Sequence, residues 1–462
     1  MISKVSIGSL SAVNLVLRQD RCNLNGLSIY AISVAPQVFP FSLSNGAALI
    51  RKRTGAYLKA EHGTKCQLNL KPRCGGRTIG HKADKSFFKS KRQWSRRKDT
   101  ILECYLPPYL AKIAKIKAPI FIVDAFAGPG KFDDGEPGSP LIICKSIQEA
   151  LSKGLSIPVS ALCIDDDREL FSKLNRTIEQ FPFAEAKYGK FSDYIRDIQV
   201  KATDHSVFLY VDPWTVEGLE WDCMDRIFQH LSISNTSIEI LLNFNAPIFV
   251  RRGLAALKLS IPESNLDIED AEEIDAPIVT PPSIERLNKV VGGDWWQNIT
   301  KSSESFPKKV QNVTDGVCER LRNRFQEVCQ HAIKALPHHV VPKYYLIFGS
   351  RHPDALILMN DQMVKSLRTL AHLAKPKDPT LFEMRPIDLV PDIEKLPPIV
   401  LKHASQPTER GTVILNVIRE CFGHFARKEI RGSIEQLLKN GELRSETGKI
   451  RINDQVKIFA VT

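Results

Sequence analysis

The stretch IFIVDAFAGPG at residues 120–130 decides the fold of this chain. An apolar run ends there at Asp124, and three small residues follow at Ala127, Gly128 and Gly130. A strand that is buried on both faces of a parallel sheet is typically a continuous apolar run of this kind. Because glycine lacks a Cβ atom, it lets the backbone take left-handed conformations and approach a ligand closely. The stretch predicts a buried strand followed by a ligand-binding turn, although a turn that binds nothing uses the same glycines.

Three further apolar runs favour the ligand-binding interpretation, because each of them also ends in polar residues. Residues 159–164 lead into Asp165, residues 207–211 into Asp212, and residues 238–242 into Asn243. Helical patterns lie between the early runs, and alternating strand and helix patterns predict a doubly wound α/β fold with a mostly parallel sheet. The carboxyl ends of such strands share one edge, where ligands bind. We therefore expect the four polar strand ends to lie together.

Two local signals add detail to this expectation. Ser139-Pro140 has the pattern of a helix N-cap followed by proline in the first turn. Asp165 stands at the tip of the second strand, where a carboxylate can accept hydrogen bonds from ribose hydroxyls. Both signals indicate a nucleotide-like ligand at the edge of the sheet.

Five segments together resemble the three-Cys-motif partner proteins (TcmP), a family whose core looks like a class I S-adenosylmethionine-dependent methyltransferase. They are FFKSKRQWSRRKDTILECYLPPYL (87–110), IVDAFAGPGKFDDGEPGSP (122–140), CIDDDRELFSKL (163–174), FLYVDPWTVEGLEW (208–221) and YYLIFGSRHPDALILMNDQM (344–363). The resemblance covers residues 87–462. It implies a Rossmann-like methyltransferase fold, a C-terminal winged helix, and a partner protein that is encoded nearby and carries the three-cysteine motif.

The resemblance also implies a binding site for S-adenosylmethionine. Asp124, Ala127, Gly128 and Gly130 would surround its methionine part, and Asp165 would hold its ribose. The third motif of the family normally supplies a carboxylate near the adenine. The corresponding stretch YGKF at residues 188–191 contains none, and the next carboxylate is Asp193.

The segment Asp212-Pro213-Trp214 resembles the acceptor motif of amino-methyltransferases, with one proline where that motif has two. The resemblance implies that Asp212 and a backbone carbonyl hold the target amine while Trp214 stacks on the base. Positioning and hydrogen bonding can aim the nitrogen lone pair at the methyl group. The alternative is structural: Asp212 caps the next turn and Trp214 packs against Trp221.

These residues leave two functions open. The first is methyl transfer to an amine nitrogen of a nucleic acid or of a nucleic-acid-associated partner. The second is a scaffold that keeps the methyltransferase fold without its chemistry and binds the three-cysteine-motif protein, since fold does not determine activity. Cleavage of nucleic acid is disfavoured, because the strand ends do not supply the paired carboxylates of a two-metal site.

The positive charge is concentrated at the start of the chain. The formal net charge of the 462 residues is +12, and residues 1–100 contain 19 Lys and Arg against 4 Asp and Glu. Residues 1–82 show no sustained helix or strand period, which favours a disordered extension, such as a nucleic-acid arm, or a misassigned start codon over a small extra domain. The basic residues that follow, at 89–98, begin a helical pattern and form either a solvated face or a phosphate contact.

The rest of the chain divides by composition into three parts. Residues 83–375 are the α/β domain, with an acidic insertion near 263–283 and a long helix predicted over 310–336; residues 376–407 are a proline-rich linker. Residues 408–462 contain helical patterns and then two short strands around a glycine turn, which indicates a winged helix. Four basic residues there are the candidate nucleic-acid contacts: Arg427, Lys428, Arg431 and Lys439. Contact with protein is the alternative, since residues 409–462 carry ten basic and seven acidic side chains.

The cysteines and the apolar runs indicate where the chain works. The ten cysteines are scattered without a CxxC pair, which favours reduced thiols in the cytoplasm and no metal site. No apolar run approaches the length of a membrane span, and no secretory signal is recognisable. We therefore expect a cytoplasmic protein without a membrane partner.

Overall fold

The computed structural model of the chain describes residues 93–231, 236–260, 282–334, 339–373 and 391–461, together with four short strands before them. Contacts divide the chain into two units, Met1–Gly80 and His81–Thr462. The acidic insertion predicted near 263–283 lies almost wholly outside the described residues.

The first unit contains strand pairing that the sequence analysis did not predict. Its four strands form an antiparallel sheet of order β1-β2-β4-β3. They are β1 (Cys22–Leu24), β2 (Leu27–Ser33), β3 (Leu49–Arg51) and β4 (Ala56–Lys59). Short antiparallel pairs need neither a long apolar run nor a regular period, which is why the pattern of the sequence missed them.

The second unit is built on a seven-stranded sheet of order β10-β11-β9-β8-β5-β6-β7. The strands are β5 (Ile120–Asp124), β6 (Val159–Asp165), β7 (Ala184–Tyr188), β8 (Ser206–Val211), β9 (Ile238–Phe244), β10 (Glu327–Ile333) and β11 (Tyr344–Ser350). The pairs among β5 to β9 are parallel, whereas β11 runs antiparallel to both β9 and β10. The predicted doubly wound, mostly parallel sheet is confirmed. The chain order reverses direction between β5 and β8, which is where a ligand crevice opens in such sheets.

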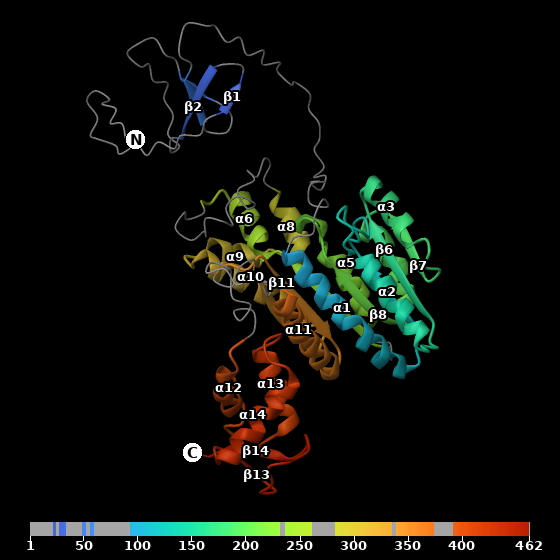
Figure 1. Cartoon of the computed structure of the whole chain (residues 1–462), viewed down its shortest axis with the longest axis vertical. Helices are drawn as coiled ribbons and strands as arrows, with labels where there is room; N and C mark the ends of the chain where they lie inside the picture. The colour runs from blue at the N-terminus through green and yellow to red at the C-terminus, as the bar shows by residue number, and fades with distance from the viewer. Residues whose placement is uncertain are drawn as a thin grey trace, which may run out of the picture. The chain divides into compact units, whose positions relative to one another are not determined.

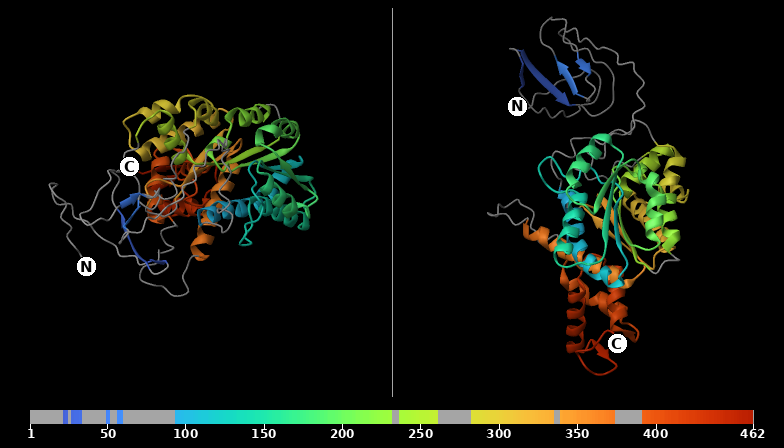
Figure 2. Two further views of the ribbon diagram at one scale, coloured as in Figure 1. Left: turned by 90° about the horizontal axis from the view of Figure 1, so that it is seen from above. Right: turned by 90° about the vertical axis from the view of Figure 1, so that its right-hand side faces the viewer.

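Both faces of this sheet are buried, and alternate residues of each strand serve opposite faces. In β5, Ile120 and Ile122 pack into one apolar layer, whereas Phe121 and Val123 pack into the other. This period of two follows from the pleat of a strand. The right-hand view of Figure 2 shows the sheet between its two layers of helices.

Helices α1 (Gln93–Ile113), α2 (Ser139–Ser152) and α11 (Pro353–Leu373) contribute to the first layer, and α3 (Arg168–Ile178) lies beside α2. Figure 1 shows α1 running between α2 and α11. The second layer is formed by six helices: α4 (Ile195–Ala202), α5 (Trp221–Leu231), α6 (Ala246–Ala256), α8 (Ile284–Val291), α9 (Trp296–Lys301) and α10 (Phe306–Arg322).

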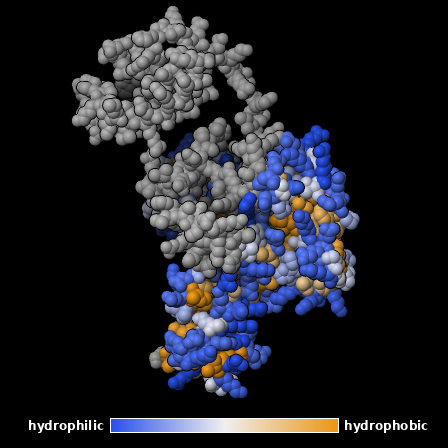
Figure 3. Space-filling model, in the orientation of Figure 1, coloured by the Kyte–Doolittle hydropathy of each residue, from blue (hydrophilic) through white to orange (hydrophobic). Residues whose placement is uncertain are grey.

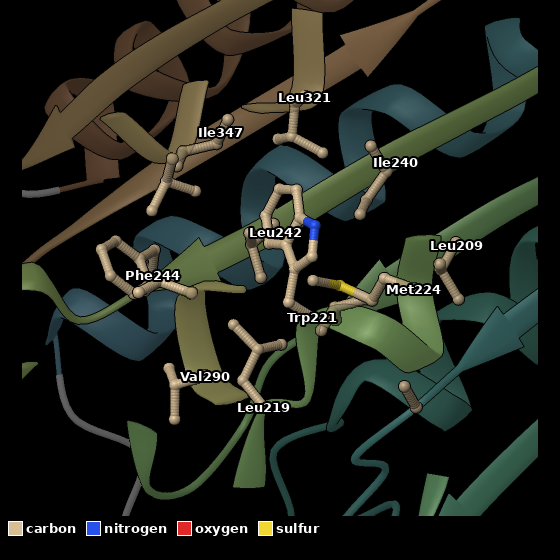
Figure 4. Close-up of a cluster of buried hydrophobic side chains, with 14 of the residues drawn as sticks. Leu209, Leu219, Trp221, Met224, Ile240, Leu242, Phe244, Val290, Leu321 and Ile347 are labelled. Carbon is tan, nitrogen blue, oxygen red and sulfur yellow. The ribbon is translucent and has the colours of Figure 1, made fainter. Parts of the chain in front are cut away.

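The centre of the second layer is drawn in Figure 4, where Trp221 of α5 lies among side chains of β8 and β9. Trp221 is 5% exposed, and Gly292 approaches its ring so closely that an added Cβ atom would overlap it. The indole is therefore a core side chain that fixes α5 and the turn after α8 against the sheet.

Three boundaries differ from those the sequence predicts. The helix expected over 310–336 ends at Arg322, and strand β10 follows, because Val328, Cys329 and Ile333 supply an edge strand with a buried face. The N-cap of α2 is Gly138, and Ser139 is the first helical residue. The predicted linker ends too late, since residues 396–403 form helix α12 (Leu396–His403) with Leu396 and Val400 buried.

The C-terminal subdomain, residues 391–461, packs onto the sheet domain instead of standing apart. After α12 it contains β12 (Thr408–Glu409), α13 (Arg410–Glu420), α14 (Arg427–Asn440), β13 (Leu443–Ser445) and β14 (Lys457–Ala460), and its sheet has the order β12-β14-β13. Its buried side chains belong to the same apolar cluster as α1 and α11. In Figure 3 its visible surface is largely hydrophilic, with small apolar patches.

Arg419 of α13 makes the main ionic contact between the C-terminal subdomain and the sheet. Its guanidinium donates to both carboxylate oxygens of Glu327 on β10, at 2.9 and 2.6 Å. The Glu327 side chain is 1% exposed, so its charge depends on this partner. No described helix is long and apolar enough to cross a membrane.

We expect Arg419→Met to lower the free energy of unfolding by about 2–3 kcal/mol, because it leaves a buried carboxylate unpaired. The double variant Arg419→Met with Glu327→Gln should recover most of this loss, because the amide needs no counter-charge. Urea unfolding of both variants measures the effect. A loss below about 0.5 kcal/mol for the single variant would show that the pair does not hold the C-terminal subdomain in place.

Candidate functional site

The glycine-rich turn after β5 is held in an open conformation above the carboxyl edge of the sheet. Gly128 and Gly130 have φ angles of 63° and 76°, in the left-handed region that glycine tolerates best. The backbone N–H groups of Ala125 and Ala127 donate to Tyr210 of β8 and Ile164 of β6, at 3.0 and 2.8 Å. The turn is thus tied to the strands on both sides of β5.

Asp165, at the end of β6, completes this restraint. One carboxylate oxygen accepts from the N–H of Gly128 at 2.8 Å, and the other accepts from the N–H of Asp167 at 2.9 Å. Burial raises the pKa of Asp165 to about 6, and the two N–H donors oppose the rise. Each carboxylate oxygen has two lone pairs, so Asp165 can shape the turn and still accept a hydrogen bond from a ligand.

Asp124, at the end of β5, is the most buried of the three strand-end carboxylates. It is fully buried, and neither of its carboxylate oxygens makes a hydrogen bond of ordinary geometry with the described residues, although Ser139 and the N–H of Phe126 lie near enough to act on its pKa. Burial raises the pKa of Asp124 to about 7; the charge of Asp212 adds to the rise, while Ser139, the N–H of Phe126 and Lys98 oppose it. A buried, unpartnered carboxyl group is costly unless a ligand satisfies it.

Asp212, at the end of β8, has both of its oxygens occupied. Lys98 of α1 forms a short ion pair with one oxygen, and the side-chain amide of Asn243 at the end of β9 donates to the other at 2.6 Å. The side chains of Lys98 and Asp212 are only 13% and 17% exposed. We call these three residues the Lys98–Asp212–Asn243 cluster.

Charges link this cluster to Asp124. Burial lowers the pKa of Lys98, but Asp212 and the carboxylates of Asp99 and Asp124 more than offset this effect, so its pKa is raised overall. Lys98 therefore stays an ammonium group. The four polar strand ends lie at one edge of the sheet, as the sequence predicts.

Trp214 lies in the loop that follows Asp212, and its side chain is 37% exposed. Together with Pro213 and Asn243 it lines a small pocket between this loop and the start of α6. Trp221, against which the structural alternative places Trp214, is buried in the core of the second layer. The next helical turn, residues 216–218, has Thr215 and not Asp212 at its N-cap position.

The stretch at residues 188–191, where the resemblance implies a carboxylate near the adenine, contains none, and the next carboxylate, Asp193, is engaged locally. Asp193 accepts from the backbone N–H of Lys190 at 2.9 Å and so closes the turn after β7. Tyr188 at the end of β7 is 50% exposed, with its ring 5.6 Å from that of Phe171.

The four basic residues predicted to contact nucleic acid lie on α14, and two of them have acidic neighbours. Arg431 pairs with Asp454, and Arg427 lies 3.9 Å from Asp361. Lys428 and Lys439 are exposed.

The sequence analysis did not assign a role to Lys98 or Asn243. Asn243 was noted as a polar strand end, whereas Lys98 was one of several basic residues at the start of a helix. Only the packing of α1 on the sheet shows that Lys98 is the basic residue that reaches Asp212. The seven described cysteines are free, and the described residues include no group of three side chains placed to hold a metal ion.

Comparison with known proteins gives no family for the chain. No family model and no curated protein matches it. Among solved structures, it is similar to an Escherichia coli protein that is itself only proposed to be a methyltransferase, with 16% identity and a TM-score of 0.19 over 29% of this chain and 65% of that one. The chain therefore spans just under two thirds of that protein.

Two further solved structures are similar to the chain. The plantazolicin methyltransferase BamL, in complex with S-adenosylhomocysteine, shares 12% identity with a TM-score of 0.27, over 58% of this chain and 88% of that one. Fibrillarin of Aeropyrum pernix, with natively bound S-adenosylmethionine, shares 8% identity with a TM-score of 0.24, over 76% of this chain and all of that one. With TM-scores far below 0.5, these likenesses support no inference about the activity of this chain.

We expect Asp124→Asn to gain stability over the parent chain as the pH rises. The folded pKa of Asp124 lies above its unfolded value, so the stability that the acid contributes is complete below the unfolded pKa and is lost as the pH rises towards 7. Between pH 4 and pH 8 the difference in unfolding free energy should shift by about 3 kcal/mol in favour of the variant. Thermal and urea unfolding across this range measures it. Asp166→Asn, which changes an exposed carboxylate nearby, is the matched control, and an equal shift there would refute the assignment.

Proposed function

We propose that the chain is an S-adenosylmethionine-dependent methyltransferase. The observation that carries this proposal is Asp124, whose buried carboxylate makes no hydrogen bond of ordinary geometry with the described residues and stands directly before a left-handed glycine turn at the switch point of the sheet. A sulfonium cofactor with an amino group would bring the positive charge that this carboxylate lacks.

The residues present fit this cofactor on its methionine and ribose sides. Asp124, Ala127, Gly128 and Gly130 would surround the methionine part, and Asp165 retains lone pairs for a ribose hydroxyl. The third motif supplies no free carboxylate for the adenine, because Asp193 accepts a hydrogen bond from the backbone N–H of Lys190.

When bound, the cofactor supplies a methyl group on a positively charged sulfur. In the proposed transfer, the lone pair of an amine nitrogen forms the bond to the methyl carbon as the carbon–sulfur bond breaks, with its electrons passing to sulfur. The methylated nitrogen then loses a proton to water. Asp212, Pro213 and Trp214 would hold and orient the acceptor, so this chain contributes positioning and electrostatics.

We further propose that the methyltransferase works in the cytoplasm with a three-cysteine-motif protein encoded nearby, on nucleic acid or on a nucleic-acid-associated partner. The order helix, strand, two helices and two strands in residues 391–461 supports a winged helix. Lys428 and Lys439 are exposed on α14 and would reach phosphates, together with Arg427 and Arg431 if these exchange their acidic neighbours for them.

A non-catalytic scaffold that binds the three-cysteine-motif protein is the second candidate. Two carboxylates favour it, because each already makes contacts within the chain. Asp212 contacts Lys98 and Asn243, and Asp193 closes a turn. A scaffold needs the fold but no free acceptor group.

Calorimetric titration of the whole chain with S-adenosylmethionine separates these functions. We expect micromolar binding, about −8 kcal/mol, which is lost in Asp165→Ala because both the ribose contact and the restraint on Gly128 disappear. Asp166→Ala, an exposed neighbouring carboxylate, should bind as the parent does. A folded protein that gives no heat with the cofactor would favour the scaffold.

We expect Asp212→Ala to abolish methyl transfer while cofactor affinity stays within about tenfold of the parent, because the motif concerns the acceptor. Transfer of a radiolabelled methyl group to nucleic acid, and to material that co-purifies with the chain, provides the assay. Unchanged turnover would exclude a role for Asp212 in handling the acceptor.

A further inference from the structure

Strand β7 forms one edge of the seven-stranded sheet, and among the described residues no strand pairs with its outer side. Figure 1 shows β7 beside α3 at the rim of the sheet domain. Helix α3 packs against one face of β7. On the opposite face a groove of about 450 Å³ is lined by side chains of β5, β6, β7 and α4. An unpaired edge of this kind is a template for pairing with another strand.

The pairing of β7 with β6 shows which of its backbone groups face outwards. The carbonyl of Phe183 accepts from the N–H of Ala161 at 2.9 Å, and the N–H of Gly189 donates to the carbonyl of Asp165 at 3.0 Å. Successive residues of a strand direct their N–H and C=O groups to opposite sides. Residues 184, 186 and 188 therefore direct theirs away from the sheet.

Two of these outward groups are already satisfied, at the two ends of the strand. The N–H of Ala184 donates to Phe181 at 3.0 Å, and the carbonyl of Tyr188 accepts from the hydroxyl of Tyr194 at 2.6 Å. The carbonyl of Ala184, both groups of Ala186 and the N–H of Tyr188 have no hydrogen-bond partner among the described residues. The free groups are thus two donors and two acceptors, placed symmetrically about Ala186.

The charged side chains of β7 have the same symmetry. Glu185 and Lys187 lie opposite Leu162 and Ile164 of β6, so both belong to the face of the sheet that carries the groove. Their charged groups lie 2.5 Å apart, and their side chains are 62% and 39% exposed. Opposite charges two residues apart on one face make a strand complementary in charge to its own antiparallel copy.

We propose that two copies of the chain join edge to edge at β7, antiparallel about a two-fold axis at Ala186, so that their sheets become one. The N–H and C=O of Ala186 bond to those of Ala186 in the second copy, and the N–H of Tyr188 donates to the carbonyl of Ala184 in the second copy. Every free outward group is then used. Glu185 of each copy lies opposite Lys187 of the other, with Cβ atoms about 5 Å apart.

Charge and backbone pairing select this register. A shift of two residues in one direction sets Glu185 against Glu185, and a shift in the other direction sets Lys187 against Lys187. Like charges directly opposite each other destabilise a strand pair. A shift of one residue would need outward groups from residues 185 and 187, whose backbone faces β6. Charged residues also protect edges from pairing, but that protection requires like charges to meet.

The dimer goes beyond the proposed function, because neither the cofactor site nor the acceptor motif takes part in it. The test is sedimentation velocity of the whole chain over a range of concentrations, where we expect a dimer that dissociates on dilution. Ala186→Pro removes the central N–H, and an edge strand tolerates proline where its N–H faces solvent. This variant should be a monomer where the parent is a dimer, with an unchanged melting temperature.

Charge variants test the partner and the register without altering the backbone. Glu185→Lys sets ammonium groups against each other at both ends of the pairing, and Lys187→Glu does the same with carboxylates. Each variant alone should dimerise at least about tenfold more weakly than the parent. An equal mixture of the two should regain the parent affinity as a heterodimer, and so should the double variant with both changes.

The matched control is Glu149→Lys, which breaks an exposed 2.5 Å pair with Lys153 on α2, away from β7. It should dimerise as the parent does. A merely structural role of the Glu185–Lys187 pair would lower the melting temperature of both single variants and give no heterodimer in the mixture.

A parent chain that stays monomeric at every concentration overturns the proposal, and so does a dimer that survives Ala186→Pro. Failure of the mixed charge variants to associate overturns the register. If a different protein co-purifies with a monomeric parent and is lost in Ala186→Pro, the edge of β7 pairs with a strand of that protein and the dimer is refuted.

Discussion

The burial of both faces of the seven-stranded sheet is the constraint on which the rest of the structure depends. Side chains such as Ile122 and Val123 point into opposite apolar layers, so a charged group in mid-strand must be satisfied locally. Glu239 in β9 is such a buried charged group, and its pKa shows the free-energy cost of burying it. Burial raises its pKa to about 7, and the hydroxyl of Tyr105 donates to it. Elsewhere along β5 to β9, the polar side chains that form the site stand at the ends of the strands.

The carboxylates at the ends of β5 and β6 have different roles. Asp165 uses its oxygens to hold the backbone of the glycine turn, so the turn is shaped before any ligand arrives. Asp124 does not hold the turn in this way and lies fully buried at the end of β5, without a hydrogen bond of ordinary geometry to the described residues. A restrained turn around an unsatisfied carboxylate is a preorganised site, because the entropy of ordering the turn is paid during folding.

The Lys98–Asp212–Asn243 cluster couples the sheet to the helix that covers it. Asp212 is a predicted acceptor residue, yet its oxygens serve an ion pair and an amide. Asn243, whose NH₂ group donates to Asp212, lines a small pocket together with Trp214. In the same way, the C-terminal subdomain is joined to the sheet through a shared apolar cluster and the buried Glu327. A comparison of motifs alone would treat all of these parts as independent.

Local patterns in the sequence were sufficient to predict the strands β5, β6, β8 and β9, the left-handed glycines and the gathering of Asp124, Asp165, Asp212 and Asn243 at one edge. Each of these follows from period, burial and the direction of parallel strands, which are properties of short segments. The strand β10 and the helix α12 were missed, because short apolar segments have no period that separates strand, helix and linker. Only the tertiary structure decided that Lys98 reaches Asp212 across a sequence separation of 114 residues, that Asp193 is used by its own turn, and that Asn243 keeps an unpaired oxygen. Hydrogen-bond partners depend on how distant elements pack, and no local pattern of residues encodes that geometry.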